Sequence, residues 1–156
     1  MNNNQLYLNS SNELMLSRNI QLQISQKEFE LQLLNINDRY SSYKPYPYQN
    51  IIKKQSLELE ISNLKNNRDI HLGFAIESAL LLAEQDLISN NVYSMASIAI
   101  SSINSFLQSQ KIDFKLSYSA QVRLSKISFL MQSKNNIASL NTEIARLKNI
   151  CNLPIT

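Results

Sequence analysis

Apolar residues recur every three or four positions through the second half of the chain, which is the period of an amphipathic α-helix. This spacing predicts helices over residues 69–89, 92–108, 113–134 and 136–150. Asp69 and Asp113 are suited to cap two of them at the N-terminus. Asparagine tolerates the left-handed conformation that closes a helix, so Asn90-Asn91 is expected to end the first. Short connections between the helices predict antiparallel neighbours in a bundle or a small helical array.

The predicted helix 113–134 is apolar on two faces. One face carries Leu116, Ala120, Leu124, Ile127 and Met131. The other carries Phe114, Tyr118, Val122 and Phe129. A helix of this kind is either central in its own bundle or buried against another chain. We therefore take the second face as a candidate partner-binding surface.

The first 65 residues allow two interpretations. Ser10 and Glu13 have the spacing of a capping box, which predicts a helix over 12–37, and a second helix is expected over 51–65, ending at Asn66-Asn67. Apolar residues alternate strictly with polar ones over residues 20–24, 29–33 and 57–61, which is the period of a strand. The scarcity of glycine and the abundance of Gln, Glu and Leu favour helices. We expect an all-α bundle or array of five to six helices, with an α+β fold containing a hairpin in residues 1–65 as the alternative.

Residues 38–50 form a connection rich in tyrosine and proline. The two closely spaced prolines disfavour helix there. Tyr43, Tyr46 and Tyr48 lie beside these prolines and suit a stiff ligand for an aromatic groove on a partner. Packing of the rings back onto the bundle is the favoured interpretation, and docking on a partner or stacking on bases beside Lys44, Lys53 and Lys54 are the alternatives. We expect residues 1–156 to form a single helical domain, with flexible ends at 1–10 and 152–156.

The composition excludes several classes of enzyme and of metal site. The single glycine, Gly73, rules out the glycine-rich loops that bind phosphates. One cysteine and one histidine are too few for a structural zinc site, and one cysteine forms no disulfide within the chain. We expect His71 to be a polar residue in the first turn of its helix and Cys151 to pack as a small apolar side chain. No catalytic residue, cofactor or metal is predicted.

The sequence also bears on location. The first residues carry no basic stretch followed by an apolar one, so no secretory signal is predicted. The longest apolar run, residues 79–83, is far shorter than the roughly 20 residues that span a bilayer. We expect a cytoplasmic protein without a membrane span, and export by another route remains open.

The formal net charge is +3, and four cations cluster on the predicted helix 113–134. At 100° per residue they fall within one arc of its surface: Lys115, Arg123, Lys126 and Lys134. Such an arc contacts anions or nucleic acid in some proteins and is a solvated edge in others.

These observations favour a non-enzymatic helical interaction protein: an assembly subunit, an adaptor, or a secretion-linked chaperone or effector. It would bury apolar helix faces against another protein chain or against itself, which requires neither glycine loops nor metals. The alternative is a small basic regulator that binds nucleic acid through the four cations.

Overall fold

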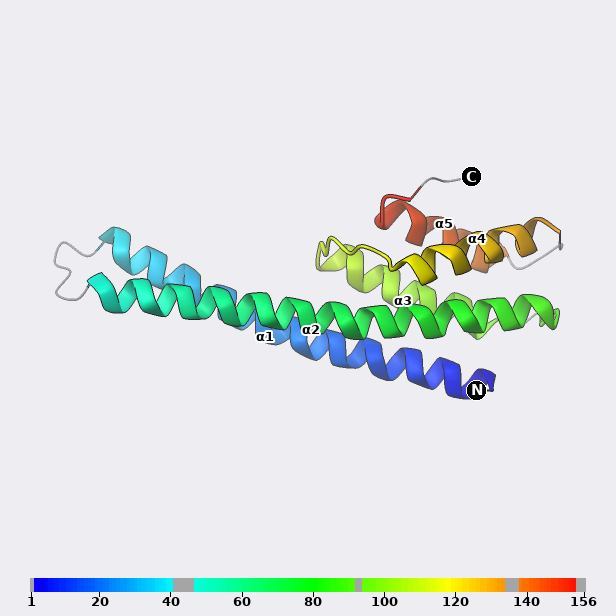
Figure 1. Ribbon diagram of the computed structural model, residues 1–156, viewed down its shortest axis with the longest axis horizontal. Coiled ribbons are helices and arrows are strands. Elements are labelled where there is room, and N and C mark those ends of the chain that lie inside the picture. Colours follow the sequence, from blue (N-terminus) through cyan, green and yellow to red (C-terminus); the bar gives the residue numbers. More distant parts are fainter. Residues whose placement is uncertain (1, 41–46, 92–93, 134–137, 154–156) are drawn as a thin grey trace. The chain divides into compact units, whose positions relative to one another are not determined.

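The computed structural model describes residues 2–40, 47–91, 94–133 and 138–153, with the side chains of these residues except 38–40 and 47–49. Within these ranges the chain forms helices and no strand (Figure 1). The helices are α1 (Asn3–Tyr40), α2 (Pro47–Ile88), α3 (Met95–Ser109), α4 (Tyr118–Gln132) and α5 (Ala138–Ile150). The all-α prediction is confirmed, and the alternative of an α+β fold with a β-hairpin in residues 1–65 is wrong.

Helix α1 begins nine residues before the predicted start at residue 12. The backbone N–H of Gln5 donates to Asn2 Oδ1 at 2.8 Å, and the backbone N–H of Asn2 donates to Gln5 Oε1 at 3.1 Å. This reciprocal pair is a capping box, so Asn2 and Gln5 take the role predicted for Ser10 and Glu13. Ser10 lies inside the helix instead, where its hydroxyl donates to the carbonyl oxygen of Ala75 at 2.9 Å.

Helix α2 is continuous where two helices were predicted. Asn66-Asn67 does not end it, because Leu64 and Arg68 occupy inward positions on either side and continued helix keeps both of them there. Asparagine costs a helix interior only about 0.7 kcal/mol, which such packing outweighs. Pro47 is the first residue of the helix, where its missing N–H leaves no hydrogen bond unmade.

The chain divides into two compact units, which are described separately. Unit 2 comprises residues 16–70, and unit 1 comprises residues 1–15 and 71–156.

Unit 2 is an antiparallel pair of helical segments from α1 and α2 (Figure 1). Its inward side chains repeat at alternating intervals of three and four residues, which is the coiled-coil pattern. We call these residues the hairpin seam: Ser17, Ile20, Ile24, Lys27, Leu31 and Leu34 of α1, and Asn50, Lys54, Leu57, Ile61, Leu64 and Arg68 of α2.

The hairpin seam mixes apolar and polar contacts. Ile24 and Ile61 are buried. Arg68 is also buried, and its guanidinium donates to Gln21 Oε1 at 2.8 Å while its carbonyl oxygen accepts from Ser17 Oγ at 3.2 Å. Ion pairs at the seam edges join Lys27 to Glu60 at 3.2 Å and Lys65 to Glu28 at 3.4 Å. Polar groups at seam positions fix the register of a coiled coil at some cost in stability.

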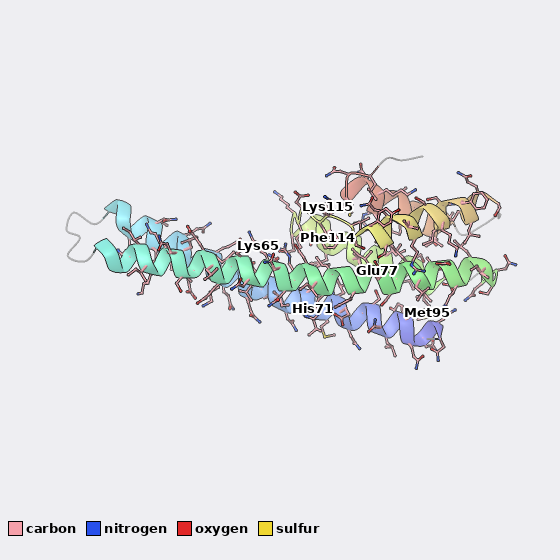
Figure 2. All side chains as sticks on the ribbon, in the orientation of Figure 1. Lys65, His71, Glu77, Met95, Phe114 and Lys115 are labelled. Carbon is pink, nitrogen blue, oxygen red and sulfur yellow. The ribbon has the colours of Figure 1, made fainter. Side chains whose placement is uncertain are left out.

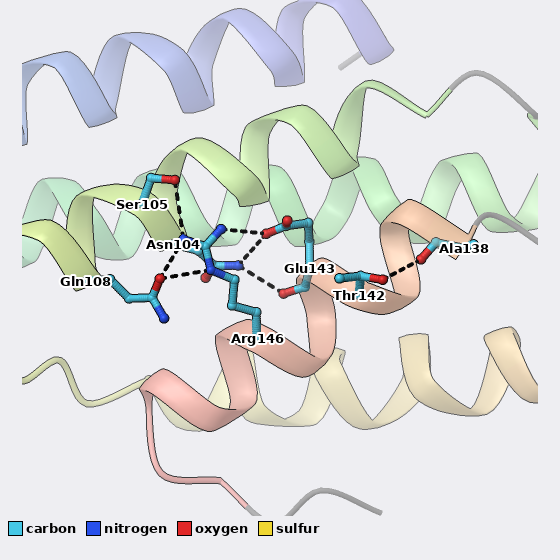
Figure 3. Close-up of polar contacts among 7 residues, drawn as sticks. All are labelled: Asn104, Ser105, Gln108, Ala138, Thr142, Glu143 and Arg146. Atoms are coloured by element: carbon cyan, nitrogen blue, oxygen red, sulfur yellow. Dashed lines mark hydrogen bonds and ion pairs between the residues drawn. The ribbon is translucent and has the colours of Figure 1, made fainter.

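Unit 1 has a contiguous apolar core to which all five helices contribute. One face of α2 is buried in this core, and so are Leu80 and Leu82 on another side; the face consists of Leu72, Ile76, Ala79, Ala83 and Leu87. By contrast, Phe74 and Ile88 of the same helix are exposed. Between α3 and α5, the side-chain amide of buried Asn104 donates to the carbonyl oxygen of Glu143 at 3.0 Å and to its carboxylate at 2.9 Å (Figure 3).

Three helices end on a residue with positive φ that is not glycine: Asn90, Lys111 and Asn152. In each case the next residue's N–H donates to the carbonyl five residues back, as Asn91 does to Asp86 at 2.9 Å. This is the Schellman arrangement, which usually uses glycine. The predicted closure at Asn90-Asn91 is confirmed, and all three helices thus close without glycine.

Helix α4 starts five residues later than predicted. Residues 112–117 form no helix, and Ile112, Phe114 and Leu116 are buried while Asp113, Lys115 and Ser117 are exposed. This alternation is the burial pattern of an extended segment lying on a core. Ser117, rather than Asp113, is the N-cap, and its hydroxyl accepts from the backbone N–H of Ala120 at 3.2 Å.

Candidate interaction surface

The outer side of α1 in unit 2 carries a row of large apolar side chains. Leu22, Phe29 and Ile36 are spaced seven residues apart and are 64%, 60% and 47% exposed. We call these three residues the outer stripe. Leu33, beside Ile36, is also exposed. Leu8 and Met15 hold the same seven-residue register on the part of α1 in unit 1, and they too are exposed.

Between Leu22 and Ile36 the exposed residues that flank the outer stripe are uncharged, whereas Arg18, one turn before Leu22, carries a charge. Ser25, Gln26 and Gln32 lie next to it on the helix surface and are exposed. Uncharged amides and hydroxyls lose less on leaving water than charged groups do. The face is therefore apolar along its centre and inexpensive to desolvate at its edges.

The predicted partner-binding face of α4 is divided by the structure. Tyr118, Val122 and Phe129 are exposed on α4 of unit 1, as a partner surface requires. Phe114 lies on the extended segment before α4 (Figure 2) and is buried in the core of unit 1. Phe114 is thus correctly identified as apolar and wrongly placed on the helix, because the helix begins only at Tyr118.

The tyrosine and proline connection is only partly described. Tyr43 and Tyr46 lie outside the described residues, and for Tyr48 only the backbone, within α2, is described. Their role as partner-binding residues therefore stays a prediction.

The predicted cationic arc does not form one surface. Lys115 lies on the segment before the start of α4 (Figure 2), and Lys134 lies outside the described residues. Arg123 and Lys126 both bind Glu84 of α2, at 2.6 Å and 2.5 Å. Glu84 is buried, and the hydrogen bond from Lys126 is the main reason that its pKa is lowered, with Arg123 contributing as well. Two of the four cations thus form ion pairs with Glu84, so the geometry lends no support to nucleic-acid binding there.

Two further polar sites in unit 1 have structural roles. His71 is in the interior of α2, not in a first turn as predicted, and its Nδ1 lies 2.6 Å from Glu13 Oε2 of α1. Buried Asp86 accepts hydrogen bonds from Asn3 at 3.0 Å and Ser94 at 3.0 Å, and from the backbone N–H of Ala96 in the first turn of α3. Burial nevertheless raises the pKa of Asp86, because desolvation outweighs these bonds.

Cys151 packs against the core as predicted, and it is half-buried. Burial is the main cause that raises the pKa of its thiol to about 11, and the charge of Asp113 adds to it. Such a thiol is a poor nucleophile near neutral pH.

The sequence contained a signal for the outer stripe that the helical assignments overlooked. Leu8, Met15, Leu22, Phe29 and Ile36 repeat at seven residues along the whole of α1. This repeat becomes visible when apolar residues are compared at intervals of exactly seven, in addition to intervals of three and four.

Among the described residues, no helix is long and apolar enough to cross a membrane. Nor does the described part of the chain hold three or more His, Cys, Asp or Glu side chains grouped around a metal position. No protein-family model, curated protein sequence or solved structure matches this chain.

Proposed function

We propose that this chain is a non-enzymatic interaction protein that assembles through unit 2, with a helix of a second copy packed on the outer stripe. The observation that carries the proposal is the exposure of Leu22, Phe29 and Ile36 at heptad spacing on a helix whose opposite side is already paired.

The spacing selects a helix as the occupant. In a straight α-helix a seven-residue repeat drifts by about 20° per heptad, and it stays aligned only when helices supercoil. The hairpin seam already follows the heptad pattern, so the outer stripe keeps a constant direction along the same helix. A third helix with apolar residues at the same period can therefore follow the stripe over its length.

The symmetry of the face supports a second copy as the partner. In an antiparallel pair centred on Phe29, Leu22 of one copy lies opposite Ile36 of the other, and the two Phe29 rings meet at the twofold axis. Ser25, Gln26 and Gln32 bring no like charges together across this contact. Isologous pairing of this kind is the commonest form of soluble assembly.

Several cellular roles fit such a module. An assembly subunit uses the contact permanently, whereas an adaptor or a secretion-linked chaperone or effector exchanges it for a helix of another protein. A cytoplasmic location is part of the proposal.

Matched phenylalanine substitutions test the proposed surface. Phe29 and Phe129 are both exposed on helices, but only Phe29 lies on the outer stripe. We expect Phe29→Gln to weaken self-association by about a hundredfold, since two apolar rings leave the contact at once. Phe129→Gln is expected to leave it unchanged, with circular dichroism verifying that both variants fold. Loss of assembly in Phe129→Gln alone would contradict the proposal.

A further inference from the structure

A groove between α4 and α5 in unit 1 contains a buried lysine. Two adjoining cavities of about 310 and 370 Å³ share three lining residues, Ser128, Gln132 and Lys148. Lys148 is 8% exposed, and its Nζ donates to Ser128 Oγ at 2.5 Å. Among the described residues, Ser128 is the hydrogen-bond partner of this ammonium group. The described lining of the two cavities includes no Asp or Glu.

This charge is poorly compensated. Burying an ammonium group is costly unless an anion or several hydrogen bonds accept its protons. Lys148 lies in the last turn of α5, where the helix dipole favours a cation, but that effect is smaller than the cost of burial. The remaining N–H donors of Lys148 are therefore available to a ligand in the groove.

The lining indicates what that ligand is. Leu124, Phe129 and Leu153 contribute apolar surface on one side of Lys148, and Met131 and Ile144 do so on the other. A single cation suits a group of one negative charge, whereas phosphate recognition uses several cations or a cluster of backbone N–H groups. We propose that this groove binds a small amphiphilic carboxylate, with its oxygens on Lys148 and Ser128 and its hydrocarbon on the apolar lining.

Calorimetric titration of the full chain with octanoate, acetate and inorganic phosphate tests this site. Octanoate is expected to bind saturably, and acetate at least about tenfold more weakly because it lacks the hydrocarbon. Phosphate binding as tight as that of octanoate, or no saturable octanoate binding, would overturn the proposal.

Substitutions assign the binding to the groove. Lys148→Met keeps the side chain as far as Cε and removes the charged ammonium, so octanoate binding should weaken by about ten- to a hundredfold. Lys115→Met removes an exposed lysine elsewhere in unit 1 and should bind octanoate as the wild type does.

Thermal stability provides a second readout. Without ligand, Lys148→Met should melt no lower than wild type, because a poorly compensated charge has been removed.

Ser128→Ala, which retains the lysine, should weaken octanoate binding less than Lys148→Met does. Undiminished octanoate binding in Lys148→Met would rule out this site.

Discussion

The Nδ1 atom of His71 lies 2.6 Å from Oε2 of Glu13, and this contact joins α1 to α2 within unit 1. Both side chains are partly buried on the facing sides of the two helices. A polar pair at such positions favours one register of the helices over its neighbours, since a shift of one turn separates the two groups.

A double-mutant cycle measures the contribution of this pair. Glu13→Ala and His71→Ala should each lower the free energy of unfolding, and the double variant should lose less than the sum of the two. We expect a coupling free energy of about 1 kcal/mol from urea unfolding at neutral pH. Additive losses would show that the two groups do not interact.

The Glu84 ion pair predicts a component of acid sensitivity. Because Arg123 and Lys126 hold the pKa of Glu84 below its ordinary value, its stabilising contribution is present above that ordinary value, about 4.3, and is lost as pH falls through the lowered pKa. At neutral pH, Glu84→Gln should lower the free energy of unfolding by about 1–2 kcal/mol. The difference from wild type should shrink on acidification.

The quantity to measure is the difference in the free energy of unfolding between wild type and Glu84→Gln. Asp86 has a raised pKa, so its contribution has the opposite sign and falls as pH rises through the raised value. The contribution of Asp86 is the same in wild type and in Glu84→Gln, so it cancels in the difference between them. A difference independent of pH would mean that Glu84 is not held in its charged form by the two cations.

Gly73 is a position where the chain is expected to gain stability. It lies inside α2, and a Cβ added there meets nothing within 4 Å. Gly73→Ala should therefore raise the free energy of unfolding by about 1 kcal/mol through helix propensity alone. The melting temperature should rise by about 2–4 °C, and a fall would reveal a contact that requires glycine.

The thiol of Cys151 should be slow to react. With its pKa raised to about 11, only about one molecule in a thousand carries the thiolate at pH 8. Iodoacetamide should alkylate the native protein about a hundredfold more slowly than the protein unfolded in urea. Equal rates would show that the end of α5 opens readily.

The strand-like alternation in the sequence has a specific origin in the helices. In residues 20–24, Ile20 and Ile24 belong to the hairpin seam and Leu22 to the outer stripe; in 57–61, seam residues Leu57 and Ile61 flank exposed Leu59. Two residues advance a helix by about 200°, so a helix that is apolar on opposite sides alternates locally like a strand. The alternation therefore marks a helix that is apolar on two sides, and the strand alternative that it suggested is wrong.

Other boundaries depended on contacts that the sequence does not display. Nothing near Asn66-Asn67 shows that Arg68 will be buried against Gln21, 47 positions away in the chain. Likewise, Asp113 and Ser117 are both good N-caps, and burial of the extended segment 112–117 decides between them. The helical class follows from local pattern, whereas helix ends and the ion pair of Glu84 follow from tertiary packing.

Sedimentation equilibrium of the wild-type protein over a range of concentrations measures whether the outer stripe joins two copies of the chain. The average mass should rise with concentration from the 17.9 kDa of one chain towards twice that value. The same rise should occur in Phe129→Gln and should shift to much higher concentration in Phe29→Gln. A wild-type mass of 17.9 kDa at every concentration would show that the outer stripe does not join two copies of the chain.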